Sequence, residues 1–511
     1  MSEPDASWEP EVAELRARLA HAEAMGGEAG VQRQHDRGRL TVRERIAAIL
    51  DPSSFREIGA LAVEKDENGP TPVNVVFGRG DIGGRPVIVV GDDFTIRGGS
   101  MNDRTLEKLV YPERLAGELR LPLIKLIESG GGSIKTTDGL GHTYVSENAG
   151  WGDVVRNLGI VPVVGLALGP AAGLAGARVV ASHYSVMVAG HGVVFAGGPP
   201  LVAQVGEVID KEALGGSKVH GANGVVTDVV KDEPAAFERA QRFLSYLPPS
   251  VYELPPRGPQ TDDPQRRDEW LISAIPKDRR KTYKIRPIVE TLVDEGTFFE
   301  MGRRWAPSIV CGFARLDGWP VAVLTEDGNY GGVLTAEGAR KTEWFVDLAE
   351  TFHLPMVRLV DQPGIAIGSQ AERDGTMRAS IKAFSAIGQA TIPWCSVLIR
   401  KVFGVGGAGH SNPGRVQYRF AWPSGHWGSL PTTGGLEAAY KSELDGHEDR
   451  EGRLAELEAR IRDIESPFRT AEAFGVEDII DPRDTRARLC EFANLAAPLR
   501  STERHPWGFR G

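Results

Sequence analysis

The sequence predicts an α/β protein made of two copies of one domain. Four segments of the first half recur in the second half in the same order, at offsets of about 243, 234, 233 and 231 residues. Apolar segments that end at glycine-rich turns alternate with helical stretches, such as 105–119 and 340–352, as in α/β folds. We therefore expect two domains, 1–255 and 284–511, joined by a Pro-, Asp- and Arg-rich linker at 256–283.

The repeated segments have a clear local character. The first ends a helical pattern, the second is a strand, a glycine-containing turn and a strand, and the last two are strands that run into glycine-rich loops. The pairs are 51–59 with 294–302, 78–87 with 312–321, 121–131 with 354–364, and 161–176 with 392–409. Outside the repeat, 437–464 is rich in Glu, Arg, Ala and Leu and is expected to form one long amphipathic helix with a solvated charged face.

Composition excludes several classes of protein. The 511 residues carry a net charge of −10, which argues against nucleic acid or an anionic membrane surface as the general partner. The three cysteines are far apart, which excludes a disulfide scaffold or a local zinc module and fits a reducing compartment. The polar N-terminus is no signal peptide, and no run of about 18 apolar residues occurs. We expect a soluble, cytoplasmic protein.

Glycine is enriched, with 62 residues, and it gathers at the ends of predicted strands. Such glycines permit positive φ and let a ligand approach bare backbone N–H groups, which can form an anion site or an oxyanion site. Tight packing of strand against helix explains single clusters equally well, and both interpretations stay open at this point. The clusters are 130–132, 169–176, 190–198, 364–368 and 404–409.

Familiar catalytic motifs are missing. Two GxGxxG matches, at 78–83 and 404–409, lie in the wrong context for a dinucleotide, and neither a P-loop nor a G-x-S-x-G elbow occurs. Four loop histidines, without the spacing of paired ligands, are expected to be solvated or locally bonded: His142, His191, His220 and His410. Glu128 and Asp361 end equivalent strands, and they fit general acid–base groups equally as well as helix N-caps or loop braces.

At this stage the motifs show a family resemblance. The chain resembles the carboxyltransferase (beta) subunit of biotin-dependent acyl-CoA carboxylases, of the propionyl-, methylcrotonyl- and geranyl-CoA carboxylase type, in the crotonase superfamily. The matching segments follow the family order over most of the chain: 34–46 (QHDRGRLTVRERI), 93–100 (DFTIRGGS), 198–202 (GPPLV), 214–216, 220–225, 332–341, 361–364 (DQPG), 400–401, 422–423, 466–468 and 481–486.

The resemblance implies an α/β fold with a tandem duplication of a crotonase-like (ClpP/crotonase) domain, and transfer of CO2 from carboxybiotin to an acyl-CoA through an enolate. The acyl-CoA is placed on the N-terminal domain and biotin on the C-terminal domain. Contacts to the thioester oxygen are assigned to Gly131, Gly132, Ala172 and Gly173. Contacts to the ureido oxygen of biotin are assigned to Gly406, Gly407 and Ala408, although the two sets are interchangeable at this level. Cofactor contacts are expected at Gly198, Gly364, Gly368 and Gly404, and no metal is expected.

The resemblance also implies partners. The chain lacks a Met-Lys-Met biotinylation site, so biotin is expected on a biotin carboxylase/biotin carboxyl carrier subunit. Family active sites lie between two subunits, which makes a dimer the minimum and a hexamer typical. Two alternatives remain: the alpha subunit of a biotin-dependent acyl-CoA decarboxylase, and an inactive acyl-CoA-binding scaffold. The sequence departs from the family pattern at 128–132, 403–410 and 427–431, around the expected acyl pocket, and the 403–410 loop favours the methylcrotonyl or geranyl type.

Overall fold

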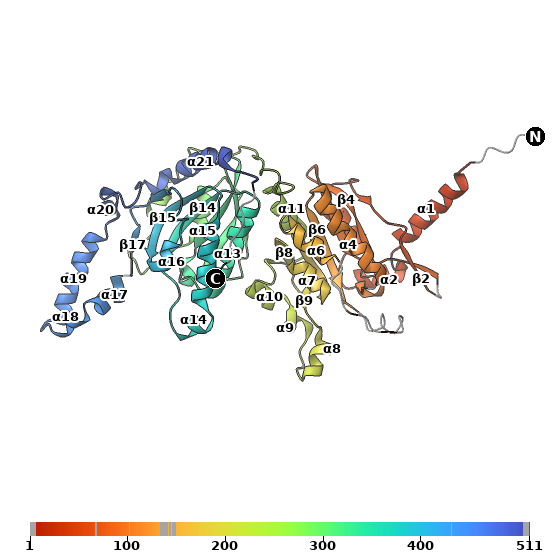
Figure 1. Cartoon of the computed structure of the whole chain (residues 1–511), viewed down its shortest axis with the longest axis horizontal. Coiled ribbons are helices and arrows are strands. Elements are labelled where there is room, and N and C mark those ends of the chain that lie inside the picture. Colours follow the sequence, from red (N-terminus) through yellow and green to blue (C-terminus); the bar gives the residue numbers. More distant parts are fainter. Residues whose placement is uncertain are drawn as a thin grey trace, which may run out of the picture. The chain divides into compact units, whose positions relative to one another are not determined.

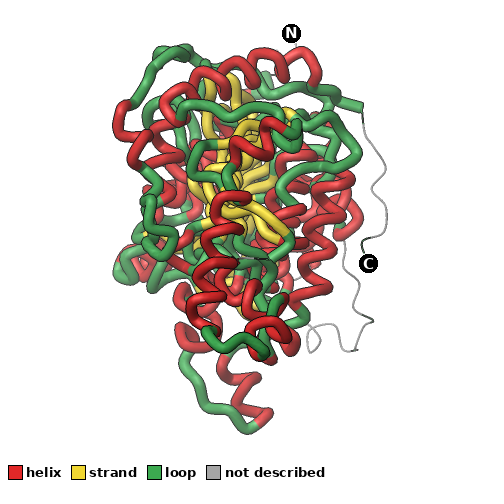
Figure 2. The backbone as a smooth tube through the Cα atoms, turned by 90° about the vertical axis from the view of Figure 1, so that its left-hand side faces the viewer, coloured by secondary structure: helices red, strands yellow, loops and turns green. Residues whose placement is uncertain are grey.

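The computed structural model describes residues 7–66, 69–101, 103–132, 142, 145, 150–430, 432–503 and 510. Contacts between residues divide the chain into two units, Met1–Tyr252 and Glu253–Gly511 (Figure 1). Helices flank the strands, as Figure 2 shows. Within the described ranges, no helix is long and apolar enough to cross a lipid bilayer.

The first unit is built on an eight-stranded sheet in the order β1-β4-β5-β6-β7-β8-β10, with β9 paired to β7. The β1–β4 and β4–β5 pairs are antiparallel, and the later pairs are parallel. The strands are β1 Arg56–Glu57, β4 Val75–Ile82, β5 Arg85–Asp92, β6 Leu123–Ser129, β7 Val163–Ala172, β8 Tyr184–Val188, β9 Val193–Phe195 and β10 Asp228–Val230, with a separate hairpin of β2 Val63–Asp66 and β3 Gly69–Pro72.

Helices of the first unit bury an apolar face and expose a polar face, as helices that cover a sheet do. In α11, for example, Phe237, Ala240 and Leu244 are buried. Thr41 and Glu44 form a capping box that starts α3. The helices are α1 Glu9–Glu23, α2 Gly27–His35, α3 Val42–Ile49, α4 Asp103–Leu119, α6 Trp151–Asn157, α7 Leu174–Val180, α8 Pro199–Val202, α9 Lys211–Gly215, α10 Ser217–Asn223 and α11 Glu233–Ser245.

The second unit repeats this plan with a seven-stranded sheet in the order β11-β12-β13-β14-β15-β16, with β17 paired to β15. The strands are β11 Phe299–Met301, β12 Ile309–Leu316, β13 Trp319–Glu326, β14 Met356–Gln362, β15 Trp394–Phe403, β16 Tyr418–Ala421 and β17 His426–Gly428. The helices are α12 Ile285–Leu292, α13 Ala336–Thr351, α14 Ser369–Arg373, α15 Thr376–Gln389, α16 Gly404–Ala408, α17 Thr432–Ala439, α18 Lys441–Asp445, α19 Arg450–Ile464, α20 Pro467–Glu472 and α21 Thr485–Ala496.

The predicted α/β duplication is confirmed down to side chains. The Arg43–Glu57 ion pair (2.7 Å) recurs as Arg286–Glu300 (2.6 Å), 243 residues later in both members. At the sheet ends, the Glu128 N–H donates to Asp92 (3.2 Å), as the N–H of Asp361, its equivalent, donates to Glu326 (3.1 Å). The predicted hairpins form β4–β5 and β12–β13. The predicted helix 105–119 lies within α4, and the predicted helix 340–352 lies within α13 except for Phe352.

The prediction of one long helix over 437–464 is wrong. The chain instead forms the end of α17, then α18 and α19. The last break follows from local chemistry: Gly446 follows α18 directly, and the Asp449 carboxylate accepts the N–H of Gly452 (2.8 Å) to start a new helix. Charge composition alone does not show where a polar helix stops.

The segment 256–283, expected as a linker, makes contacts inside the second unit. The Gly258 N–H donates to the carbonyl of Gly318 (2.8 Å), and Arg257 pairs with Asp317. Leu271 is only 2% exposed and belongs to the apolar core of that unit. The Pro- and Arg-rich composition of 256–283 is therefore compatible with a segment that hydrogen bonds hold against the second unit.

Candidate active site

In the first unit, the loop after β6 lies against the end of β7. Gly131 has a φ of +86°, in the left-handed region that favours glycine. A Cβ atom there would lie 2.9 Å from the carbonyl oxygen of Ala172, so a larger residue would push the two segments apart. The Gly131 carbonyl accepts the N–H of Met101 (3.1 Å), and its own N–H donates to Ser129 Oγ (3.2 Å). The structure thus brings the predicted residues Gly131 and Ala172 together.

Gly173 connects β7 to α7 through a turn that requires positive φ. Its φ is +59°, and its N–H donates to the carbonyl of Phe195 (3.0 Å). Leu174 is the next residue and the first of α7. Because the first N–H groups of a helix have no partner within it, the Leu174 N–H is available to a ligand. Sequence reasoning missed this residue because a backbone donor leaves no trace in the residue type.

The second unit contains the same arrangement. The carbonyl of Gly364 accepts the N–H of Leu334 (2.9 Å), as that of Gly131 accepts Met101. Gly404 follows β15 with a φ of +57°, as Gly173 follows β7. By position in the repeat, Ile365 and Val405 are then the counterparts of Gly132 and Leu174.

The glycines of α16 make close backbone contacts. A Cβ atom on Gly406 would lie 2.7 Å from the carbonyl carbon of Gly364, and one on Gly407 would lie 2.6 Å from that of Val402. Ala408 ends the helix. These positions therefore seat α16 directly on the Gly364 loop and on β15.

The remaining predicted glycines lie apart from these contacts. Gly132 forms a bridge with Met101 and would give a Cβ atom open space. Gly198 precedes α8 and lies near the ring of Phe195. Gly368 precedes α14 with a φ of +106° and has nothing within 4 Å of its Cβ position.

Glu128 and Asp361 are buried braces. Glu128 is completely buried and accepts hydrogen bonds from Gln34 (2.7 Å) and Arg39, with Arg45 at 2.6 Å. Asp361 accepts the hydroxyl of Tyr283 (2.8 Å) and the N–H of Lys401 (3.2 Å). Both carboxylates hold loop-bearing strands in place, which resolves the alternatives left open by the sequence in favour of bracing.

Two of the loop histidines are locally bonded, as expected. His410 Nδ1 lies 2.8 Å from the carbonyl oxygen of Gly407, and His220 Nε2 lies 2.6 Å from that of Val194. Burial lowers the pKa of His410 to about 4, so its ring is neutral at neutral pH. A neutral ring that hydrogen-bonds a backbone carbonyl positions the α16 loop.

A cationic cavity of about 350 Å³ lies beside the first loop. It is lined by Arg33, Arg37 and Arg97 together with Phe94 and Gly98. The Gly98 carbonyl accepts the N–H of Gly130, which connects the cavity to the Gly131 loop. Arg97 pairs with Glu64, whereas in the described part of the chain Arg33 and Arg37 have no carboxylate partner. Sequence analysis missed this site because its cations come from separate segments.

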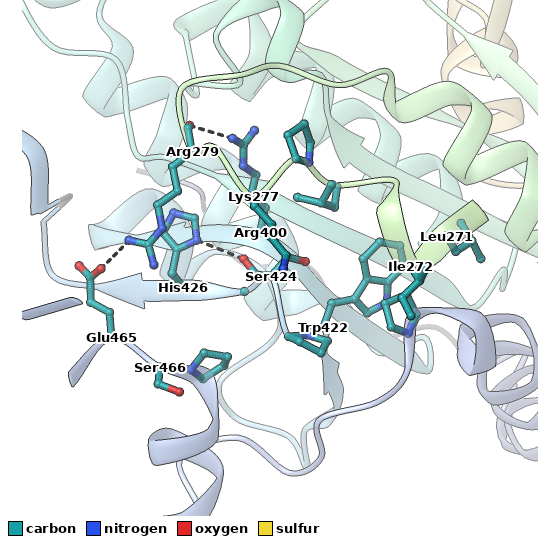
Figure 3. Close-up of a pocket in the computed structure, with 16 residues that line it drawn as sticks. Leu271, Ile272, Lys277, Arg279, Arg400, Trp422, Ser424, His426, Glu465 and Ser466 are labelled. Atoms are coloured by element: carbon teal, nitrogen blue, oxygen red, sulfur yellow. Dashed lines mark hydrogen bonds and ion pairs between the residues drawn. The ribbon is translucent and has the colours of Figure 1, made fainter. Parts of the chain in front are cut away.

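A second cavity, of about 330 Å³, lies in the second unit (Figure 3). Its arginines already form an ion pair and hydrogen bonds with other groups of the chain. Arg279 pairs with Glu465 (2.6 Å), and Arg400 donates to the carbonyls of Arg279 (2.8 Å) and Lys281 (2.9 Å). Burial, with Arg279 nearby, lowers the pKa of His426 to about 4. This cavity is therefore less suited to a polyanion than the first. Among the described side chains, no group of three or more His, Cys, Asp or Glu could hold a metal ion.

Comparison with known proteins identifies the fold and the chemistry. The model of the carboxyl transferase domain family matches residues 33–511. The chain belongs to this family. Both sheets and the loops that follow β6, β7, β14 and β15 lie within the matched range, so the family covers both candidate oxyanion regions.

Relatives in the carboxyl transferase family match along most of their length. The propionyl-CoA carboxylase carboxyltransferase subunit of Haloferax mediterranei is 32% identical over 501 residues, covering 94% of this chain and 95% of the relative. The methylmalonyl-CoA carboxyltransferase 12S subunit of Propionibacterium freudenreichii is 30% identical, with 97% and 96% covered. The methylmalonyl-CoA decarboxylase subunit alpha of Veillonella parvula is 29% identical, with 95% and 96% covered.

A solved family structure has the same fold. The hexameric transcarboxylase 12S crystal structure with bound methylmalonyl-CoA superposes with a TM-score of 0.90 at 29% identity and covers 99% of both chains. The present fold is thus the duplicated crotonase-like carboxyltransferase fold. The chain is an acyl-CoA carboxyltransferase of the biotin-dependent type.

Proposed function

We propose that this carboxyltransferase moves CO2 from carboxybiotin to a short acyl-CoA, with the thioester held by the first unit and the ureido group of biotin by the second. The observation that carries the proposal is the duplicated turn, in which a glycine at positive φ ends a long strand beside a second glycine loop. Two oxygen atoms gain negative charge in this reaction, and backbone N–H groups that are fixed in advance stabilise such charge best.

In the first unit, Gly131 and Ala172 shape the thioester site, and Gly173 sets the turn. Because the Gly173 N–H is already bonded to Phe195, we assign the donors to Gly132 and Leu174. In this assignment, Gly198 supports the ring of Phe195, whose carbonyl holds Gly173 in place.

In the second unit, the equivalent donors are the N–H groups of Ile365 and Val405. Gly364 and Gly404 set their conformations, and Gly406, Gly407 and Ala408 seat the short helix behind them. Neutral N–H donors suit a ureido oxygen that is uncharged at first and gains negative charge during the reaction. A cation would instead bind this oxygen before the reaction as well as during it. Gly368, at the start of α14, lies farther along the same loop and is expected to line the approach to it.

The residues of this chain position and polarise, and no side-chain base is required. Carboxybiotin, carried by a partner subunit, supplies the CO2 and, after losing it, the base that removes the substrate proton. The backbone N–H groups of Leu174 and Gly132 bind the thioester oxygen as the enolate forms. The negative charge therefore stays on an oxygen that two N–H dipoles, fixed in advance by the fold, already contact. Glu128 and Asp361 stay ion-paired or hydrogen-bonded beneath the loops and keep these donors in place.

The cationic cavity supports CoA as the carrier of the acyl group. CoA bears several phosphate charges, and Arg33 and Arg37 lie within reach of a ligand beside the Gly131 loop, without competing carboxylates. Phe94, which lies beneath Arg37 with its ring centre 5.8 Å from the guanidinium carbon, offers an apolar face to an adenine ring.

Among substrates, we propose a short acyl-CoA such as propionyl-CoA. Propionyl-CoA carboxylase subunits of Haloferax mediterranei and Homo sapiens are 32% identical to this chain, and that of Roseobacter denitrificans is 31% identical. These relatives favour propionyl-CoA over the methylcrotonyl or geranyl type that the 403–410 loop suggested. We further propose a cytoplasmic homo-hexamer that works with a biotin-carrying subunit, by likeness to the hexameric transcarboxylase 12S.

The proposal is tested by mixing the chain with carboxylated biotin carrier and a panel of acyl-CoAs. We expect labelled CO2 to appear in the short acyl-CoA. Binding of acyl-CoA without transfer would contradict the proposal and identify an inactive acyl-CoA-binding scaffold. Transfer that proceeds only from the carboxylated acyl-CoA to biotin would identify a decarboxylase, as in the Veillonella parvula relative.

The CoA assignment has its own test. Replacing both Arg33 and Arg37 with Gln removes the two cations that have no carboxylate partner among the described residues, so KM for the acyl-CoA should rise about tenfold or more while kcat changes little. KM for the matching acyl-pantetheine, which lacks the nucleotide, should not change. Arg18→Gln is the matched control, because Arg18 pairs with Glu14 on the exposed helix α1. An equal rise for both thioesters would refute the assignment.

A further inference from the structure

A small cavity lies between α4, α6 and α7 of the first unit, where α4 and α6 pack together. Figure 1 labels these three helices. Its volume is about 20 Å³. Its walls are mostly apolar and come from Leu106, Leu109, Val110, Trp151, Val154 and Leu174. Glu113 and Arg178 are the charged residues that line it. We call it the α4–α6–α7 cavity.

The charges around this cavity balance. Arg178 pairs with Asp92 (2.8 Å), and Glu113 pairs with Lys125 (2.8 Å), and all four side chains are buried. An additional buried carboxylate would therefore have no free cation to neutralise it, and its desolvation would be costly. The cavity is suited to an uncharged, mainly apolar occupant.

Arg178 also limits how deep an occupant can reach. The residue is 3% exposed, and its Nη2 atom has no hydrogen-bond partner in the described part of the chain. A long alkyl chain packed against Nη2 would keep this buried charged donor without a hydrogen-bond partner, which costs binding energy.

We propose that the α4–α6–α7 cavity receives the alkyl end of the acyl group and sets the chain length that the enzyme accepts. The inference rests on the proposed function, through Leu174. The backbone N–H of Leu174 is the assigned donor to the thioester oxygen, and its side chain lines the cavity. An acyl group whose carbonyl is bound at Leu174 therefore lies next to this cavity. A volume of about 20 Å³ holds one or two non-hydrogen atoms, which matches an acyl group as short as propionyl.

The experiment enlarges the cavity and measures kcat/KM for hexanoyl-CoA relative to propionyl-CoA, using the full chain with carboxylated biotin carrier. Trp151→Ala should raise this ratio about tenfold or more, because each methylene in an apolar pocket changes discrimination by about 10- to 200-fold. Val154→Ala removes less volume and should raise the ratio about threefold, which keeps the inference testable if Trp151→Ala does not fold.

Val155→Ala is the matched control, because Val155 lies on the same helix but is 55% exposed and does not line the cavity. It should leave the ratio within about twofold of wild type. An unchanged ratio in the folded Trp151 or Val154 variant would overturn the inference while leaving the proposed function standing. If the wild-type chain carboxylates no acyl-CoA, the proposed function fails, and the ratio of the two Kd values in the same variants then decides the cavity by itself.

Discussion

At the scale of single residues, glycines determine what neighbouring side chains can do. Gly169 lies on β7, where its missing side chain leaves room for Glu128 on the adjacent strand. A Cβ atom at this position would lie 2.5 Å from Cγ, Cδ and Oε1 of Glu128. Glu128 cannot turn away, because Gln34, Arg39 and Arg45 hold its carboxylate. A glycine that the sequence showed only as part of a cluster thus makes room for a buried ion pair.

We expect Gly169→Ala to lower the free energy of unfolding by about 2 kcal/mol, because the added methyl overpacks a site with no room to relax. Urea denaturation at neutral pH measures this change. Gly152→Ala is the control: it lies in the exposed part of α6 with nothing within 4 Å of its Cβ position. There alanine should be neutral or stabilising by up to about 1 kcal/mol, owing to its higher helix propensity. Equal stabilities of the two variants would show that the Glu128 site is not rigid.

At the scale of elements, α3 connects the N-terminal segment to the sheet. Arg45 on α3 is 1% exposed and lies between two buried carboxylates, Glu128 on β6 and Glu233 on α11. The two contacts measure 2.6 Å and 2.7 Å. The Thr41 capping box fixes where α3 begins and therefore where Arg45 lies.

Replacing Arg45 with Met should cost about 3–5 kcal/mol of unfolding free energy, because Glu233 then keeps a buried charge without this partner. Arg450→Met provides the comparison, since Arg450 pairs with Glu437 on the exposed surface and should change stability by less than about 1 kcal/mol. Both are measured by urea denaturation at pH 7. A loss below 1 kcal/mol for Arg45→Met would mean that Glu233 finds water or another donor.

Elements also show the limit of sequence reasoning. The strands and glycine turns of the repeat were predictable because apolar alternation and glycine are local signals that occur twice. The breaks after α17 and α18 were not predictable, because a strongly charged segment has no clear apolar periodicity whose interruption would indicate the end of a helix. The cationic cavity was also missed, since Arg33, Phe94 and Arg97 become neighbours only through folding. Leu174 was missed for another reason: a backbone donor leaves no trace in the residue type.

At the scale of the whole molecule, one structural plan occurs twice, and the proposed function uses each copy for a different substrate. Each unit ends its long strand, β7 or β15, at a glycine with positive φ, which is +59° for Gly173 and +57° for Gly404. The surroundings differ. The cationic cavity and the α4–α6–α7 cavity belong to the first unit, whereas the cations around the cavity of the second unit are mostly paired. Duplication therefore provides two similar turns, and the differences between the units support the proposed assignment of one substrate to each.

This division of labour predicts different defects for equivalent substitutions. A β-branched residue is strained at positive φ, so Gly173→Val and Gly404→Val should both displace the following N–H donor and lower carboxyl transfer by about 10²- to 10³-fold. Release of CO2 from carboxylated carrier without acyl-CoA needs only the site for the ureido oxygen. Gly173→Val should keep this release within about twofold of wild type, whereas Gly404→Val should lose it in proportion to transfer, because the Val405 N–H no longer points at the developing charge. Labelled CO2 measures both activities, and circular dichroism confirms that each variant is folded. The reverse pattern would exchange the substrates between the units, and loss of release in both variants would show that the two turns act as one site.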